Sequence, residues 1–88
     1  MRNYEVEIVN RLGLHARAAA KFVQTAGRFQ SQIEVSRGEK KINGKSIMGV
    51  MMLAAAQGAR IEITSAGEDE EEALNALVAL VEDGFGET

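Results

Sequence analysis

The only histidine of the chain, His15, is the residue with the strongest potential for chemistry. It precedes an alanine-rich run, so we expect it at the start of a helix. A helix start has backbone N–H groups without partners and carries the positive end of the helix dipole, which together favour an anion. Arg17, two residues further on, can offer two parallel hydrogen bonds to a phosphate. Because a neutral imidazole is a nucleophile at cellular pH, this pair could receive a phosphoryl group.

A simpler interpretation of the same residues stays open, because an exposed loop histidine beside a solvated arginine gives the same local pattern. Two residues before the histidine is Gly13, and we expect it to leave space for the approach of a partner.

The chain has no cysteine and one histidine, which excludes a zinc site of the ordinary His/Cys type. It also lacks a Walker-type glycine-rich loop, so neither a metal nor a cofactor is expected.

Ser46 is the second candidate, because it precedes a predicted helix. A phosphate is favourable at a helix start, so Ser46 could be a regulatory phosphorylation site. A plain N-cap is the alternative, since serine is among the commonest caps.

The apolar residues Ile47, Met48, Met51 and Met52 cannot all be buried on one face of a short helix. They form either core or an exposed, adaptable contact patch.

Length and charge limit the classes of protein. The 88 residues suffice for one domain, which we assign to residues 1–88. With 10 basic and 13 acidic residues the net charge is −3, which argues against a nucleic-acid binder. Basic residues nevertheless gather in the first third of the chain, which suggests an anionic ligand or an acidic partner there. No signal segment and no apolar stretch of about 20 residues is present, so we expect a cytoplasmic protein without membrane insertion.

The apolar pattern predicts the elements that must hold these side chains. Alternation predicts a strand over residues 4–9, with Tyr4 on its buried side, and further strands near 33–35, 40–43 and 61–63. Helical spacing predicts helices over about 16–26, from Ser46 to near Gly58, and from Asp69 to Gly84. Asp69 and Glu72 have the spacing of a capping box, and residues 85–88 should be loosely held. The order β-α-β-β-α-β-α, with one-sided strands, predicts helices on one face of a four-stranded sheet and water on the other.

Two motifs carry a family resemblance. Residues 10–18 (Asn-Arg-Leu-Gly-Leu-His-Ala-Arg-Ala) resemble the active-site signature of HPr, the histidine-containing phosphocarrier of the bacterial phosphotransferase system. Residues 45–53 (Lys-Ser-Ile-Met-Gly-Val-Met-Met-Leu) resemble its serine-site signature. The chain length, the order of elements and the glutamate-rich last helix match as well. The resemblance implies an α+β fold, an open-faced β-sandwich whose antiparallel four-stranded sheet is covered on one face by three helices.

The resemblance also implies a function. His15 would take a phosphoryl group from enzyme I, which draws on phosphoenolpyruvate, and pass it to the IIA domain of a sugar permease, with Arg17 assisting. The protein would then be a stoichiometric carrier and not an enzyme, and we expect it to be a monomer. Ser46 would be the target of an ATP-dependent HPr kinase/phosphorylase. The residues that map onto the partner-contact surface of the family are Ala20, Ile47, Met48 and Met51.

One position departs from the family, and two functional alternatives remain. Ala18 stands where the family usually has proline, which should leave the start of the helix less rigid. One alternative function is that of the nitrogen-related paralogue of HPr. Two regions resemble it, namely the amino-terminal stretch and the run Glu-Glu-Glu-Ala-Leu-Asn-Ala-Leu-Val. The chain could also be a purely regulatory module whose His15 is never phosphorylated. A small enzyme of the acylphosphatase type would need an anion loop and a water-positioning side chain, and we find no convincing pair.

Overall fold

Backbone pairing joins four strands into one antiparallel sheet in the computed structural model, which describes residues 1–87. The spatial order of the strands is β1-β4-β2-β3. The elements, in chain order, are β1 (Arg2–Glu7), α1 (Ala16–Ala26), β2 (Gln32–Arg37), β3 (Lys40–Asn43), α2 (Ile47–Met52), β4 (Arg60–Ala66), α3 (Glu70–Glu82) and a 3-10 turn (Gly84–Gly86). The predicted order of strands and helices is confirmed.

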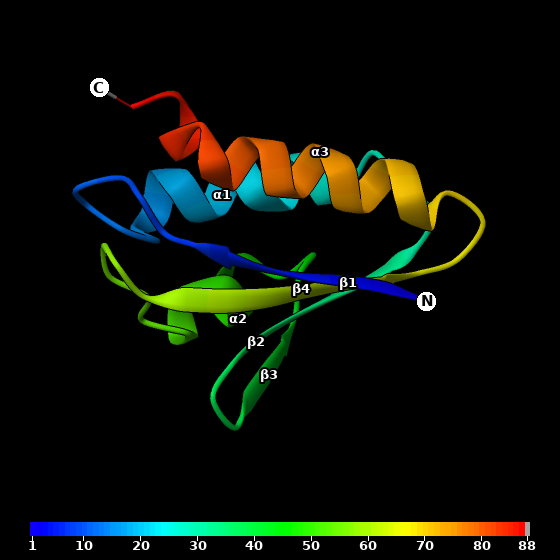
Figure 1. The fold of residues 1–88 in the computed structure, drawn as a ribbon, viewed down its shortest axis with the longest axis horizontal. Helices are drawn as coiled ribbons and strands as arrows, with labels where there is room; N and C mark the ends of the chain where they lie inside the picture. The colour runs from blue at the N-terminus through cyan, green and yellow to red at the C-terminus, as the bar shows by residue number, and fades with distance from the viewer. Residues whose placement is uncertain (88) are drawn as a thin grey trace.

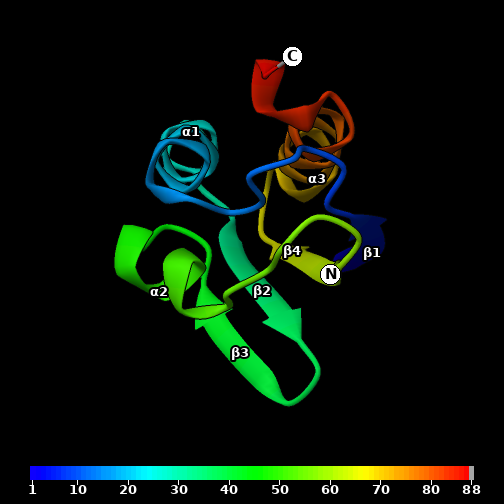
Figure 2. The same cartoon turned by 90° about the vertical axis from the view of Figure 1, so that its left-hand side faces the viewer.

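All three helices lie on one side of the sheet, with α1 and α3 side by side and α2 next to α1 near β3 (Figures 1 and 2). Their buried faces meet the inward residues of the strands, and both contribute to a single apolar core. The opposite face of the sheet is polar, since the paired residues Glu5, Glu62 and Ser36 form a row across it. The predicted open-faced α+β sandwich is therefore confirmed. Within residues 1–87, no helix is long and apolar enough to cross a membrane.

Two element predictions are wrong in detail. The first strand spans Arg2–Glu7 and not residues 4–9. Tyr4 lies on the helix-covered face as predicted, since it pairs with Ile63 and lines a pocket with residues of α3, but it is 51% exposed because β1 is at the edge of the sheet. The second helix ends at Met52 and not near Gly58. Ala54 has a φ of 50°, which breaks the helical path. Arg37 of β2 donates hydrogen bonds to the carbonyl oxygens of Leu53 and Ala54, at 3.0 and 3.2 Å, so the hairpin caps the end of this helix.

The C-terminal segment also differs from the expectation of a loose tail. Phe85 is 1% exposed and belongs to the core, flanked by Gly84 and Gly86 with φ of 64° and 73°. The Lys21 ammonium of α1 donates a hydrogen bond to the Phe85 carbonyl oxygen at 2.6 Å. Burial of one aromatic side chain therefore anchors residues 85–87, whereas Thr88, the last residue of that predicted tail, lies outside the described residues.

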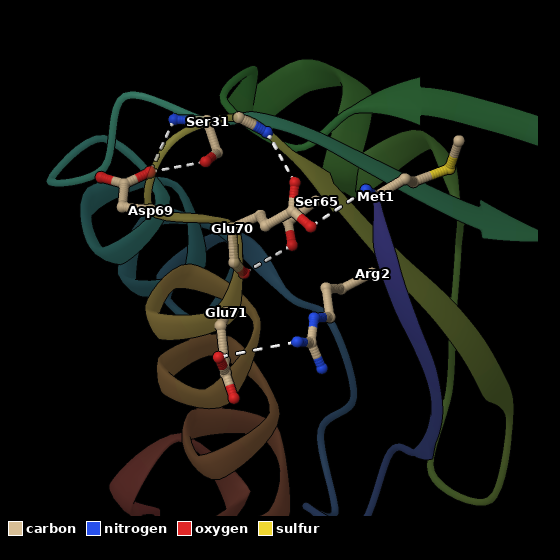
Figure 3. Close-up of polar contacts among 8 residues, drawn as sticks. Met1, Arg2, Ser31, Ser65, Asp69, Glu70 and Glu71 are labelled. Carbon is tan, nitrogen blue, oxygen red and sulfur yellow. Dashed lines mark hydrogen bonds and ion pairs between the residues drawn. The ribbon is translucent and has the colours of Figure 1, made fainter.

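The start of α3 is held by contacts to the loop before β2, in place of the predicted capping box. The Asp69 carboxylate accepts hydrogen bonds from the Ser31 backbone N–H at 2.9 Å and from the Ser31 hydroxyl at 2.5 Å (Figure 3). It also accepts a hydrogen bond from the Gln30 backbone N–H at 2.9 Å. The Ser31 hydroxyl first, and then the Gln30 N–H, lower the pKa of the Asp69 carboxyl. Beside it, the Gly67 N–H and then the N-terminal ammonium of Met1 lower the pKa of Glu70.

These lowered values make stability depend on pH. The stabilising contribution of Asp69 is complete above the ordinary aspartate pKa of about 3.9 and is lost as the pH falls through the lower pKa of the folded state. We expect Asp69→Asn to lower the melting temperature by several degrees at pH 7, because the amide oxygen cannot accept all three hydrogen bonds. The difference from the wild type should shrink as the pH falls below the ordinary aspartate pKa of about 3.9. Thermal unfolding of both proteins across this range checks the prediction, and a difference that stays constant would contradict it.

Candidate functional site

His15 is the N-cap of α1, as the sequence predicts. Its φ of −74° and ψ of 176° are extended, and its carbonyl oxygen accepts the Ala19 N–H at 2.8 Å. The imidazole does not cap the helix, and no side chain within residues 1–87 takes its place. The first-turn N–H groups are therefore free to bind an anion at the histidine.

The loop before His15 is held against Ala55 and Ala56. The Leu14 N–H donates to the Ala55 carbonyl oxygen at 2.9 Å, and Gly13 has a φ of +65°. A Cβ at Gly13 would lie 2.5 Å from that Ala55 oxygen and 2.9 Å from the Ala56 Cα. The expectation that this glycine leaves space for a partner is thus wrong, because the space it leaves is filled by the protein itself.

Glu87 is a site residue that sequence reasoning missed. One oxygen of its carboxylate is hydrogen-bonded to His15 Nε2, and the other accepts a hydrogen bond from Asn10 Nδ2 at 3.0 Å. The His15 ring first, and then the Asn10 amide, lower the pKa of the Glu87 carboxyl. The His15 and Glu87 side chains are 28% and 18% exposed. No local pattern could have revealed this pair, because 72 positions separate its members.

Arg17 lies at the same surface pocket but does not bind the ring. His15, Arg17, Arg11 and Glu87 all line this pocket. Arg17 is exposed, and its guanidinium has no hydrogen-bond or ion-pair partner in the part of the chain that the structure describes. It therefore remains available for an anion bound beside the ring. Among the same residues, no group of three or more His, Cys, Asp or Glu side chains could hold a metal ion.

Ser46 and the residues after it form a second surface. The Ser46 hydroxyl accepts the Gly49 N–H at 3.1 Å, so this residue is the N-cap of α2. Val50 and Leu53 provide the core contacts of this segment. The exposed fractions of Ile47, Met48, Met51 and Met52 are 44%, 73%, 41% and 62%. We call these four residues the α2 patch. Ala20 is half-buried on α1, which packs against α2.

Comparison with known proteins identifies the family that has this arrangement. The family model described as "PTS HPr component phosphorylation site" matches residues 3–83. The chain belongs to the HPr family. The phosphocarrier protein HPr of Neisseria meningitidis serogroup A is 53% identical over 87 residues, which cover 99% of this chain and 98% of that protein. The HPr of Pseudomonas aeruginosa is 56% identical over 84 residues, covering 94% and 93%.

Solved HPr structures share the fold. HPr-C-His from Thermoanaerobacter tengcongensis has a TM-score of 0.96 and 53% identity, and the match covers 100% of this chain and 99% of that chain. An HPr dimer from the same organism has a TM-score of 0.79 and 54% identity, covering 99% and 100%. The sandwich described above is therefore the HPr fold, and at least one similar HPr is known as a dimer.

Proposed function

We propose that this protein carries a phosphoryl group on His15. It accepts the group from phospho-enzyme I, with phosphoenolpyruvate as the source, and passes it to IIA domains of sugar permeases. The observation that carries the proposal is the place of His15 at an uncapped helix start, with Arg17 free at the same pocket. The protein would act as a monomeric cytoplasmic carrier of one domain, residues 1–88, and not as an enzyme.

The contact with Glu87 involves one of the two ring nitrogens of His15 and leaves the other free. An ionised carboxylate only accepts hydrogen bonds, so Nε2 is the donor in the pair with Glu87. In the neutral ring the lone pair is then on Nδ1, which has no hydrogen-bond partner among residues 1–87. Nδ1 attacks phosphorus, and the bond from phosphorus to the donor protein breaks with its electron pair leaving on the donor. The first-turn N–H groups and Arg17 stabilise the charge of the transferred group.

A stoichiometry experiment tests this function. The protein is incubated with radiolabelled phosphoenolpyruvate and a catalytic amount of enzyme I, and bound label and released phosphate are followed together. A carrier stops at one phosphoryl group per chain and is discharged when a IIA domain is added. Continuous phosphate release without bound label would indicate an enzyme instead. Absence of label would favour a regulatory module that acts through protein contacts alone.

Ser46 is proposed as the regulatory site, phosphorylated by an HPr kinase/phosphorylase. The α2 patch begins directly after it, so a charge there would lie at the surface proposed to meet partners, which also includes Ala20. Because aspartate is as good an N-cap as serine, Ser46→Asp should preserve the fold.

We expect Ser46→Asp to slow phosphoryl transfer from enzyme I by about tenfold at low salt, with a smaller effect at high salt, because the added charge acts on association. Transfer rates measured at low and high ionic strength check this. Ser46→Asn is the matched control, since it caps the helix without a charge and should transfer at the wild-type rate. Equal rates for Ser46→Asp and Ser46→Asn at low salt would count against the proposal.

A further inference from the structure

The segment after α3 holds Glu87 against the histidine through several independent contacts. Phe85 is buried in the core, and Lys21 binds its carbonyl oxygen. Asn10, which is 6% exposed, donates from Nδ2 both to the Gly13 carbonyl oxygen at 2.8 Å and to Glu87 at 3.0 Å. The carboxylate is therefore anchored through the oxygen that does not contact the His15 ring.

The two partners of Asn10 define the orientation of its amide. Both the Gly13 carbonyl and the Glu87 carboxylate are acceptors, so the amide must present its nitrogen to them. A rotated amide would place Asn10 Oδ1 against the Gly13 oxygen, where two acceptors repel. Asn10 is thus a constant donor toward Glu87, and only the second carboxylate oxygen remains for His15 Nε2.

We propose that Glu87 is a positioning residue, which holds the His15 ring with the proton on Nε2 and the lone pair on Nδ1. This inference rests on the carrier function proposed above. A neutral imidazole has two tautomers, and only one of them leaves Nδ1 able to attack phosphorus. When the nitrogen–phosphorus bond forms, the ring gains positive charge, and Nε2–H can donate a stronger hydrogen bond to the carboxylate without losing its proton. A carboxylate plays the same part toward histidine in the serine-protease triad.

Two variants of equal charge separate this role from a general effect of charge. In Glu87→Gln the amide oxygen must face Asn10, because two amino groups cannot pair. The amide nitrogen then faces His15 Nε2, which has to accept, and the ring proton moves to Nδ1. We expect transfer from enzyme I to slow by about tenfold, the equivalent of one net hydrogen bond. In Glu87→Ala the ring is free to adopt both tautomers, so the rate of transfer from enzyme I should fall by only about twofold.

The tautomer of His15 is measured without any phosphoryl donor, from the ¹⁵N chemical shifts of the ring nitrogens in the unphosphorylated protein. The measurement is made at about pH 8.5, where an ordinary histidine is neutral. We expect the proton on Nε2 in the wild type, on Nδ1 in Glu87→Gln, and on both nitrogens in Glu87→Ala. A wild-type tautomer in Glu87→Gln, or equal rates for the two variants, would overturn the role of Glu87 and leave the carrier function intact. A wild-type protein that takes no phosphoryl group would overturn both.

Discussion

Replacing His15 with alanine should abolish phosphoryl acceptance and leave the fold intact. No other group within residues 1–87 combines a neutral nucleophile with an uncapped helix start, so no residual transfer is expected. The fold should survive, because the imidazole makes no capping hydrogen bond and is not part of the core. Phosphoryl acceptance is measured as the phosphorylated fraction after incubation with enzyme I and phosphoenolpyruvate. The stability of the fold is measured by circular dichroism during thermal unfolding.

Arg17→Ala is the comparison for this experiment. Because the guanidinium is exposed and without a partner in residues 1–87, its removal should cost no stability, and acceptance should be slowed without being lost. If His15→Ala still accepted one phosphoryl group from enzyme I, another residue would be the acceptor. The assignment of the site would then be wrong even if the family is right.

Replacing Gly13 with alanine should give the largest loss of stability among the changes considered near the site. Its φ of +65° costs an alanine about 1–2 kcal/mol. The new Cβ would also lie 2.5 Å from the Ala55 oxygen, which adds about 1–3 kcal/mol of overpacking. We expect the free energy of unfolding to fall by about 3 kcal/mol, measured by urea denaturation. Transfer should slow as well, because the loop positions the histidine.

Gly38→Ala provides a matched control for the backbone contribution. Gly38 has a similar φ of +60°, but a Cβ there would meet nothing within 4 Å. Gly38→Ala should therefore lower the free energy of unfolding by about 1 kcal/mol, the cost of the left-handed conformation alone. Equal losses for the two variants would show that contact with Ala55 does not hold the loop.

Features determined by local sequence were predictable. The alternation in the strands and the spacing of apolar residues in the first and last helices gave the elements and their order. The position of His15 at a helix start followed from the glycine and the alanine-rich run around it. Such signals act over a few residues, so a single sequence is enough to detect them.

Contacts between distant parts of the chain were not predictable. Asp69 has good spacing for a capping box, yet the N–H groups before β2 compete for its carboxylate. Gly13 looks like an open position until Ala55 is placed beside it. Glu87 looks like one more acidic residue near the end of an acidic helix, and only the burial of Phe85 brings it to the histidine. Each depends on tertiary packing that no local pattern encodes.

The most direct test of the carrier function is the intact mass of the wild-type protein after incubation with phosphoenolpyruvate and a catalytic amount of enzyme I, recorded before and after mild acid. The carrier function predicts a mass increase of one phosphoryl group that mild acid removes, because phosphohistidine is acid-labile. An unchanged mass, with enzyme I shown to be active on another HPr, would contradict it. So would an acid-stable group, since that would place the phosphoryl on a hydroxyl such as that of Ser46.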